Sequence, residues 1–163
     1  MKKLFLLLSV VCTVFVMNSC AKAPQEPVVE KETIDKERVK QLITDICRCS
    51  GQGDNYYAME ECFADTIWPH PSGKPRYRHN IADKTRRFVE SYPYYEVSDP
   101  YNFTFLNDTF PLTVKCNVDI NWVNKNYTEK EALIRKTYYI NADYKVTGYE
   151  DKELDRETIQ EYL

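Results

Sequence analysis

The longest run of strict alternation in the sequence extends from Leu112 to Trp122. Its even-numbered residues are all apolar, and its odd-numbered residues are all polar. Because successive side chains of a β-strand point to opposite faces, this run predicts one long strand with an apolar face and a polar face. Such a strand is typical of an antiparallel sheet that is covered on one side only, so the rest of the chain has to supply the cover.

Helical periodicity precedes this strand and supplies the candidate cover. Apolar residues recur at spacings of three and four over residues 33–46, where Thr33 or Asp35 is placed to cap a helix. A second helix is expected from residue 54 towards residue 68. A third is expected over residues 81–91, and Pro93 ends it.

The sequence after Pro93 changes to a period of two. Further strands are expected at residues 94–97, 102–106, 130–142 and 144–150, with turn-forming residues between them. Residues 154–163 are expected to form a short helix or a frayed tail. Helices followed by hairpin-linked strands predict an α+β domain with an antiparallel sheet of four or more strands.

The N-terminus has the features of an export signal. Lys2 and Lys3 precede an apolar run over residues 4–17, which is too short to span a bilayer. Asn18-Ser19-Cys20 then resembles the lipobox of bacterial lipoproteins. We therefore expect a signal peptide at 1–19, a lipidated Cys20 with a flexible tether at 20–32, and a folded domain at 33–163. The alternative is an ordinary secreted protein.

The predicted export and the net charge of the chain together limit the kinds of partner that we expect. A lipidated protein would sit in the bacterial cell envelope, held to a membrane by its N-terminal lipid, on the periplasmic face or the cell surface. The formal net charge is −3 and the pI is about 5.5. Because this leaves no excess of basic residues to neutralise phosphates, nucleic acid is not expected as a partner.

The order of elements resembles the NTF2-like (SnoaL-like) superfamily. The resemblance is carried by the stretch from Asp83 to Val97, by Phe63-Ala64-Asp65 and by Val146-Thr147-Gly148-Tyr149. It implies a cone in which three N-terminal helices pack on a curved antiparallel sheet. A cystatin-like or other helix-on-sheet α+β domain is the competing fold.

Four cysteines remain in the expected domain. In an exported protein they suggest two disulfides. A helical hairpin favours the pairing of Cys47 with Cys62, which leaves Cys49 to pair with Cys116. The alternative is that they are thiols, since Cys62 and Cys116 occupy apolar-face positions where free cysteine packs as a small hydrophobe. No metal site is expected, because Cys47-Arg48-Cys49 lacks the spacing of zinc ligands.

The resemblance also implies where a site would lie, because enzymes of the superfamily place an Asp, His, Tyr or Arg inside the cone. The candidates of this type each have a simpler role in a turn, a loop or a cross-strand pair; they are Asp65, His70, His79, Asp119 and Arg135. The sequence has no nucleophile–base spacing and no phosphate-binding glycine loop. We therefore expect no catalysis and no cofactor.

The aromatic content favours a binding pocket instead, because the chain carries 13 Tyr and 7 Phe. The residues expected to line it are Tyr57, Trp68, Trp122, Arg135, Tyr138 and Tyr139. The function expected is binding of a small apolar or aromatic ligand, or of a peptide. The alternatives are an envelope interaction or scaffold protein that forms a homodimer through its sheet, and an isomerase, dehydratase or hydrolase-like enzyme. Asp65-Thr66-Ile67 also resembles a bacterial O-glycosylation acceptor at Thr66.

Overall fold

The computed structural model describes residues 33–51, 53, 55–68 and 74–154. The chain divides into two compact units, Met1–Thr33 and Ile34–Leu163, and every helix and strand described belongs to the second. The predicted signal peptide, Cys20, the tether and residues 155–163 lie outside the described residues. The elements in chain order are α2 (Lys36–Arg48), η1 (Tyr56–Cys62), β1 (Thr66–Ile67), β2 (Arg76–Tyr77), α3 (His79–Val89), β3 (Tyr94–Val97), β4 (Tyr101–Phe105), β5 (Leu112–Val123), β6 (Glu129–Ile140) and β7 (Val146–Leu154).

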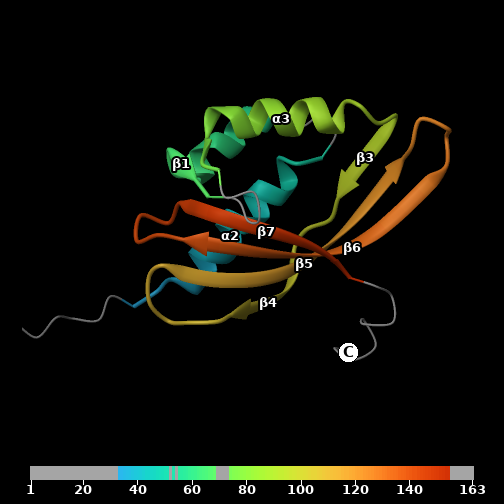
Figure 1. Cartoon of the computed structure of the whole chain (residues 1–163). Coiled ribbons are helices and arrows are strands. Elements are labelled where there is room, and N and C mark those ends of the chain that lie inside the picture. Colours follow the sequence, from blue (N-terminus) through green and yellow to red (C-terminus); the bar gives the residue numbers. More distant parts are fainter. Residues whose placement is uncertain (1–32, 52, 54, 69–73, 155–163) are drawn as a thin grey trace, which may run out of the picture. The chain divides into compact units, whose positions relative to one another are not determined.

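Strand β5 is the centre of the main sheet, as its alternation predicted. It pairs antiparallel with β6 along its whole length, and β6 pairs in turn with β7 (Figure 1). Leu112, Val114, Cys116 and Val118 are at most 1% exposed and form the floor of the core. The α+β class and the antiparallel sheet are therefore confirmed.

Strands β3 and β4 are not partners of one another, which corrects the expected run of hairpins. Both pair antiparallel with β5, β3 opposite residues 120–123 and β4 opposite residues 114–117. They thus lie end to end along the same edge of β5. Ser98 bridges the interruption, because its N–H donates to the Asp119 carbonyl and its hydroxyl accepts from the Asp119 N–H.

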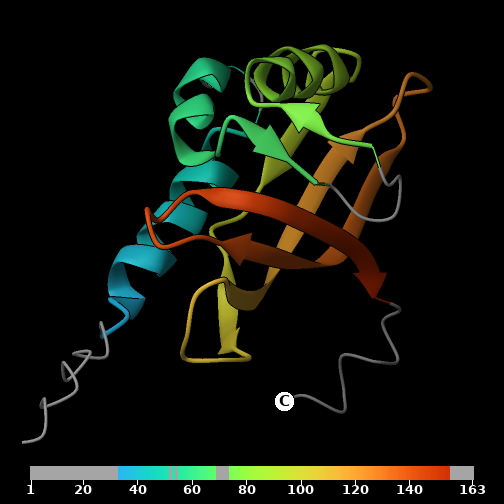
Figure 2. The same ribbon diagram turned by 60° about the vertical axis from the view of Figure 1, so that its left-hand side comes forward.

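Helices α2, η1 and α3 lie on the same side of the main sheet (Figure 2). Asp35 caps α2, since its carboxylate accepts a hydrogen bond from the Arg38 N–H at 3.0 Å. Val39, Ile43 and Ile46 face the sheet from α2 and belong to the main core cluster. Burying this stripe supplies the apolar cover that β5 requires.

The second helix is a 3₁₀-helix, η1, rather than the expected α-helix. It buries Tyr56 and Met59, which are three residues apart, and leaves Tyr57 exposed. Three residues per turn is the repeat of a 3₁₀-helix, so this spacing places both buried side chains on one face.

A short hairpin of β1 and β2, absent from the sequence-based expectations, packs against β7. The Trp68 N–H donates to the Thr147 carbonyl at 2.9 Å. A Cβ on the neighbouring Gly148 would lie 2.8 Å from the Trp68 carbonyl oxygen, so glycine is required for this approach. The contact holds the β1–β2 hairpin beside β7 and brings Arg76 to the edge of the space between helices and sheet.

Among the helices of the described part, none is both long and apolar enough to cross a bilayer.

Candidate functional site

A cavity of about 250 Å³ lies between the helices and the main sheet. Its walls come from the end of α2, from η1, β2 and α3, and from β3, β6 and β7. Most of the lining residues are apolar or aromatic, and the others are charged residues together with Ser50 and Thr85. The apolar and aromatic lining residues are Ile46, Met59, Phe63, Ile81, Phe88, Val89, Tyr95, Tyr138 and Tyr149; the charged ones are Arg76, Lys84, Lys136 and Asp151.

An ion pair between Lys136 and Asp151 is the main polar feature of the cavity wall. The two residues are cross-strand partners on β6 and β7, on the same face as Tyr138 and Tyr149. The Lys136 Nζ donates to both carboxylate oxygens of Asp151, each at 3.1 Å. The Lys136 side chain is 17% exposed and the Asp151 side chain is 46% exposed. The lysine is thus held inside the wall, and the carboxylate reaches towards water.

The charge of Lys136 is maintained by its partner. Burial by itself lowers the pKa of the ammonium, but the Asp151 carboxylate and the hydrogen bonds to it raise that pKa, and the net result is a raised pKa. Lys136 is therefore a fixed cation at neutral pH and a poor amine nucleophile. An ammonium has three hydrogens, so it has donor capacity beyond its bonds to Asp151.

Two phenols of the cavity, Tyr95 and Tyr138, keep their protons at neutral pH. Burial raises the pKa of Tyr95, and burial also raises that of Tyr138 well above its ordinary value. The Tyr138 hydroxyl lies 3.9 Å from the Cys47 Sγ. In chemical terms the cavity thus offers a carboxylate that can accept a proton, an ammonium that can stabilise negative charge, and neutral hydroxyl groups.

The cysteines are not suited to nucleophilic chemistry. Burial raises the pKa of the Cys62 thiol to about 11 and that of the Cys116 thiol to about 12, and it also raises the pKa of Cys47. Cys47, Cys62 and Cys116 are thiols in the structure, so neither expected pairing, Cys47 with Cys62 or Cys49 with Cys116, is formed. The alternative interpretation, that Cys62 and Cys116 are free cysteines that pack as small hydrophobes, fits the buried Cys116, whereas Cys62 is only half-buried.

The buried Cys116 thiol predicts a loss of stability at alkaline pH. Its pKa is raised on folding, so its contribution to the free energy of unfolding is complete below the unfolded pKa near 9 and is lost as the pH rises towards 12. We expect a decrease of about 1.4 kcal/mol per pH unit above pH 9 from this group. Urea unfolding between about pH 8 and 10.5 measures it. Cys116→Ala should show a shallower decrease, and equal slopes in the two proteins would contradict the assignment.

The six residues expected to form the pocket are not brought together. Tyr138 lines the inner cavity. Tyr57 and Trp68 are 57% and 58% exposed. Arg135 and Tyr139 occupy odd-numbered positions of β6, on the outer face of the sheet, where the Arg135 Nε donates to Asn117 and the Tyr139 hydroxyl donates to Glu150. Trp122 lines a different hollow.

Of the other candidates, His70 lies outside the described residues, and Asp65, His79 and Asp119 do not line the cavity. Asp65 forms an ion pair with Arg78 at 3.2 Å, and the exposed His79 stacks on Tyr77. Asp119 accepts a hydrogen bond from the Tyr101 hydroxyl on the outer face. Thr66 is exposed on β1, and its O-glycosylation stays a prediction. Within the described ranges no group of His, Cys, Asp or Glu is arranged to hold a metal ion.

The sequence did not identify the charged site residues Lys136, Asp151, Arg76 and Lys84. For Lys136 a signal existed: Ile134, Tyr138 and Ile140 share its parity on β6, so a lysine stands among inward-facing apolar positions. For Asp151 no such signal existed, because its position depends on the register of β7 against β6. Arg76 depends on a two-residue strand, which is too short to show alternation.

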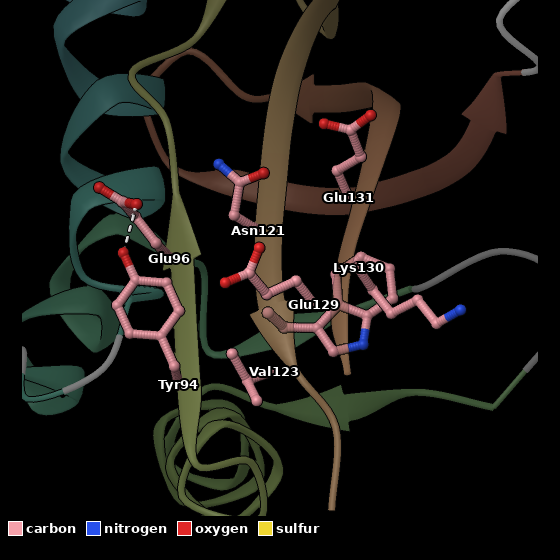
Figure 3. Close-up of a pocket in the computed structure, with 8 residues that line it drawn as sticks. Tyr94, Glu96, Asn121, Val123, Glu129, Lys130 and Glu131 are labelled. Atoms are coloured by element: carbon pink, nitrogen blue, oxygen red, sulfur yellow. Dashed lines mark hydrogen bonds between the residues drawn. The ribbon is translucent and has the colours of Figure 1, made fainter. Parts of the chain in front are cut away.

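A second hollow, of about 760 Å³, lies on the outer face of the sheet across β3, β5 and β6. Figure 3 shows the carboxylates of Glu96, Glu129 and Glu131 around it, with the Tyr94 hydroxyl bonded to Glu96 at 2.6 Å. The side chains that line this hollow are exposed or half-buried, so its charged groups remain hydrated. The inner cavity is the better candidate, because its lining includes the 17% exposed Lys136 and several deeply buried apolar residues, and a charged group interacts more strongly where it is less hydrated.

Comparison with known proteins places the fold. No known protein family and no curated protein matches the sequence. Solved structures do match. An NTF2-like protein of unknown function from Exiguobacterium sp. 255-15 has 12% identity and a TM-score of 0.56, with 72% of this chain and 98% of that chain covered. The chain has the NTF2-like fold. The expected α+β cone with helices packed on a curved sheet is thus confirmed.

Other NTF2-like neighbours are named as enzymes. The epoxide hydrolase/cyclase-like enzyme SalBIII, with a role in pyran ring formation in the polyether salinomycin, has 15% identity and a TM-score of 0.58 over 74% of this chain and 93% of that chain. A candidate polyketide cyclase from Xanthomonas campestris pv. campestris has 15% identity and a TM-score of 0.55 over 76% and 96%. These neighbours overturn the expectation that this domain is not an enzyme. A fold does not by itself fix a function, so any activity has to be argued from the site.

Proposed function

We propose that the inner cavity binds a small, largely apolar molecule and that Asp151 and Lys136 perform acid–base chemistry on it. The observation that carries the proposal is the ion pair of Lys136 and Asp151 in the wall of a cavity lined mainly by apolar and aromatic residues. A carboxylate beside a fixed ammonium suits removal of a proton from a carbon or hydroxyl group, because the ammonium stabilises the negative charge that develops. The names of the neighbouring cyclase and epoxide hydrolase/cyclase-like proteins support reactions of this class.

The volume of the cavity limits the substrate. At about 250 Å³ it is just below the range of roughly 300–1,000 Å³ that drug-sized ligands occupy. A single ring or a short branched chain fits such a space. Phe63 from the C-terminal end of η1 and Phe88 from α3 provide aromatic surface for it.

Binding is the first step to test. The full chain is titrated with phenol, acetophenone, phenylacetamide and phenylacetate, and complexes are detected by ligand-observed NMR. Thr85→Trp puts an indole into the cavity from α3 and should abolish binding. Thr128→Trp, in the exposed turn between β5 and β6, is the matched control and should bind as the parent does. Binding that survives Thr85→Trp would place the ligand elsewhere and refute the proposal.

We further propose that this domain is held in the bacterial envelope by a lipid on Cys20. The support is the charged, apolar and Cys-terminated order of residues 1–20. Cys20→Ala should release the protein from membranes into the soluble fraction. Persistence of the variant in the membrane fraction would contradict lipid anchoring.

A homodimer through the outer face of the sheet is the second candidate. One end of this face is acidic and the middle of it is basic, so two antiparallel copies would match their charges. The residues concerned are Glu96, Glu129 and Glu131, and Lys115, Arg135 and Lys152. Light scattering at low and high salt tests it, and a mass of one chain at both would exclude it.

A further inference from the structure

Positive charge predominates among the ionic side chains of the inner cavity. Three cations line it, Arg76, Lys84 and Lys136, against one anion, Asp151. The chain as a whole has the opposite balance, with 25 acidic and 22 basic residues. Asp151 is engaged by Lys136, so the pair is close to neutral. The excess positive charge therefore belongs to Arg76 and Lys84.

Arg76 is bonded to a neutral group. Its Nη1 donates to the Tyr149 hydroxyl at 3.1 Å, and no carboxylate of the described residues lies within 4.0 Å of it. A guanidinium has five N–H donors in a planar fork that matches a carboxylate. By contrast, nearby Arg78 and Arg86 are each paired with a carboxylate. Arg76 thus keeps a charge and donors that no carboxylate of the described residues neutralises.

Arg76 and Lys84 lie near the solvent end of the cavity. Arg76 is half-buried on β2, and Lys84 is exposed on α3, the helix that follows β2 directly. Other lining residues are apolar and deeply buried, since Met59 and Phe63 are 2% and 3% exposed. A ligand matched to both sets of residues has an apolar body and one anionic end.

We propose that the inner cavity is built for a small organic carboxylate, whose apolar body fills the cavity and whose charge is bound by Arg76 with Lys84. This inference rests on the proposed function and adds the substrate class to it. Arginine takes the main role because its fork can donate two parallel hydrogen bonds to one carboxylate. Lys84, being exposed, adds a charge that salt screens.

The experiment compares phenylacetate with phenylacetamide, which has nearly the same shape and no charge. We expect the full chain to bind phenylacetate at least about tenfold more tightly at neutral pH, as hydrogen bonds to charged groups would provide. Arg76→Gln should remove most of this preference and leave the affinity for phenylacetamide nearly unchanged. Arg76→Lys keeps the charge and should retain part of the preference. Arg87→Gln, exposed on α3 and absent from the cavity lining, is the matched control.

The outcomes separate the two proposals. Equal affinity for acid and amide, with both lost in Thr85→Trp, overturns the carboxylate inference and leaves the proposed function intact. A preference for the acid that Arg76→Gln does not change also overturns the inference. Failure of phenylacetate and phenylacetamide to bind overturns the inference, and failure of phenol and acetophenone as well overturns the proposed function with it. Thermal unfolding of each variant verifies that Arg76→Gln has not lost its fold.

Discussion

Asp151→Asn is expected to lower the turnover of a cavity substrate by about 10²–10⁴-fold, the usual contribution of a general acid or base. The amide has nearly the same shape as the carboxylate but does not accept a proton. Ligand affinity should change much less than kcat, because the cavity walls remain. Turnover is measured with a compound that the binding panel identifies, and kcat and KM are determined separately.

Glu150→Gln is the matched control for this prediction. Glu150 precedes Asp151 on β7 and lies on the outer face, where it accepts a hydrogen bond from the Tyr139 hydroxyl. The Glu150→Gln substitution makes the same chemical change, carboxylate to amide, one residue away and should leave the turnover at the parent rate. If Asp151→Asn binds the substrate and turns it over at the parent rate, Asp151 is not the base.

Leu112→Ala is expected to lower the free energy of unfolding by about 2–5 kcal/mol. Leu112 is 0% exposed at the start of β5 and belongs to the main core cluster, so truncation leaves a cavity in addition to the lost burial. Leu106→Ala makes the same substitution at a position that is 52% exposed, six residues earlier. It should change the free energy by no more than about 0.5 kcal/mol.

Urea unfolding of the two variants measures the difference. A comparable loss in both would mean that the even-numbered face of β5 is not the buried face. The comparison tests whether the apolar face of the alternating stretch of residues 112–122 is buried. Burial of that face decides the side of the sheet on which the helices and the inner cavity lie.

The long elements could be predicted because their patterns are unambiguous. Eleven alternating residues identify β5, and the expected strand at residues 94–97 coincides with β3. The helix from residue 36 follows from an apolar stripe and the Asp35 cap. These features depend on neighbours in the sequence, so local side-chain chemistry is sufficient to reveal them.

The site could not be predicted to the same extent, because it depends on pairing between distant segments. Lys136 and Asp151 become neighbours only through the register of β6 and β7. The pocket expected from the sequence combines Tyr138 with Tyr139 because both are aromatic. Consecutive residues of a strand point to opposite faces, so only Tyr138 faces the cavity. The nature of η1 also depends on packing, since spacing of three in seven residues is a weak signal.

The half-exposed position of Asp151 has a consequence for isotope labelling. A carboxylate in contact with bulk water exchanges an acquired proton directly with the solvent and needs no chain of internal donors. A proton that Asp151 removes from the substrate would therefore exchange with water before a proton is transferred back to the product. Rearrangement of a substrate in D₂O would place deuterium in the product, whereas an enclosed base would transfer the original hydrogen within one molecule.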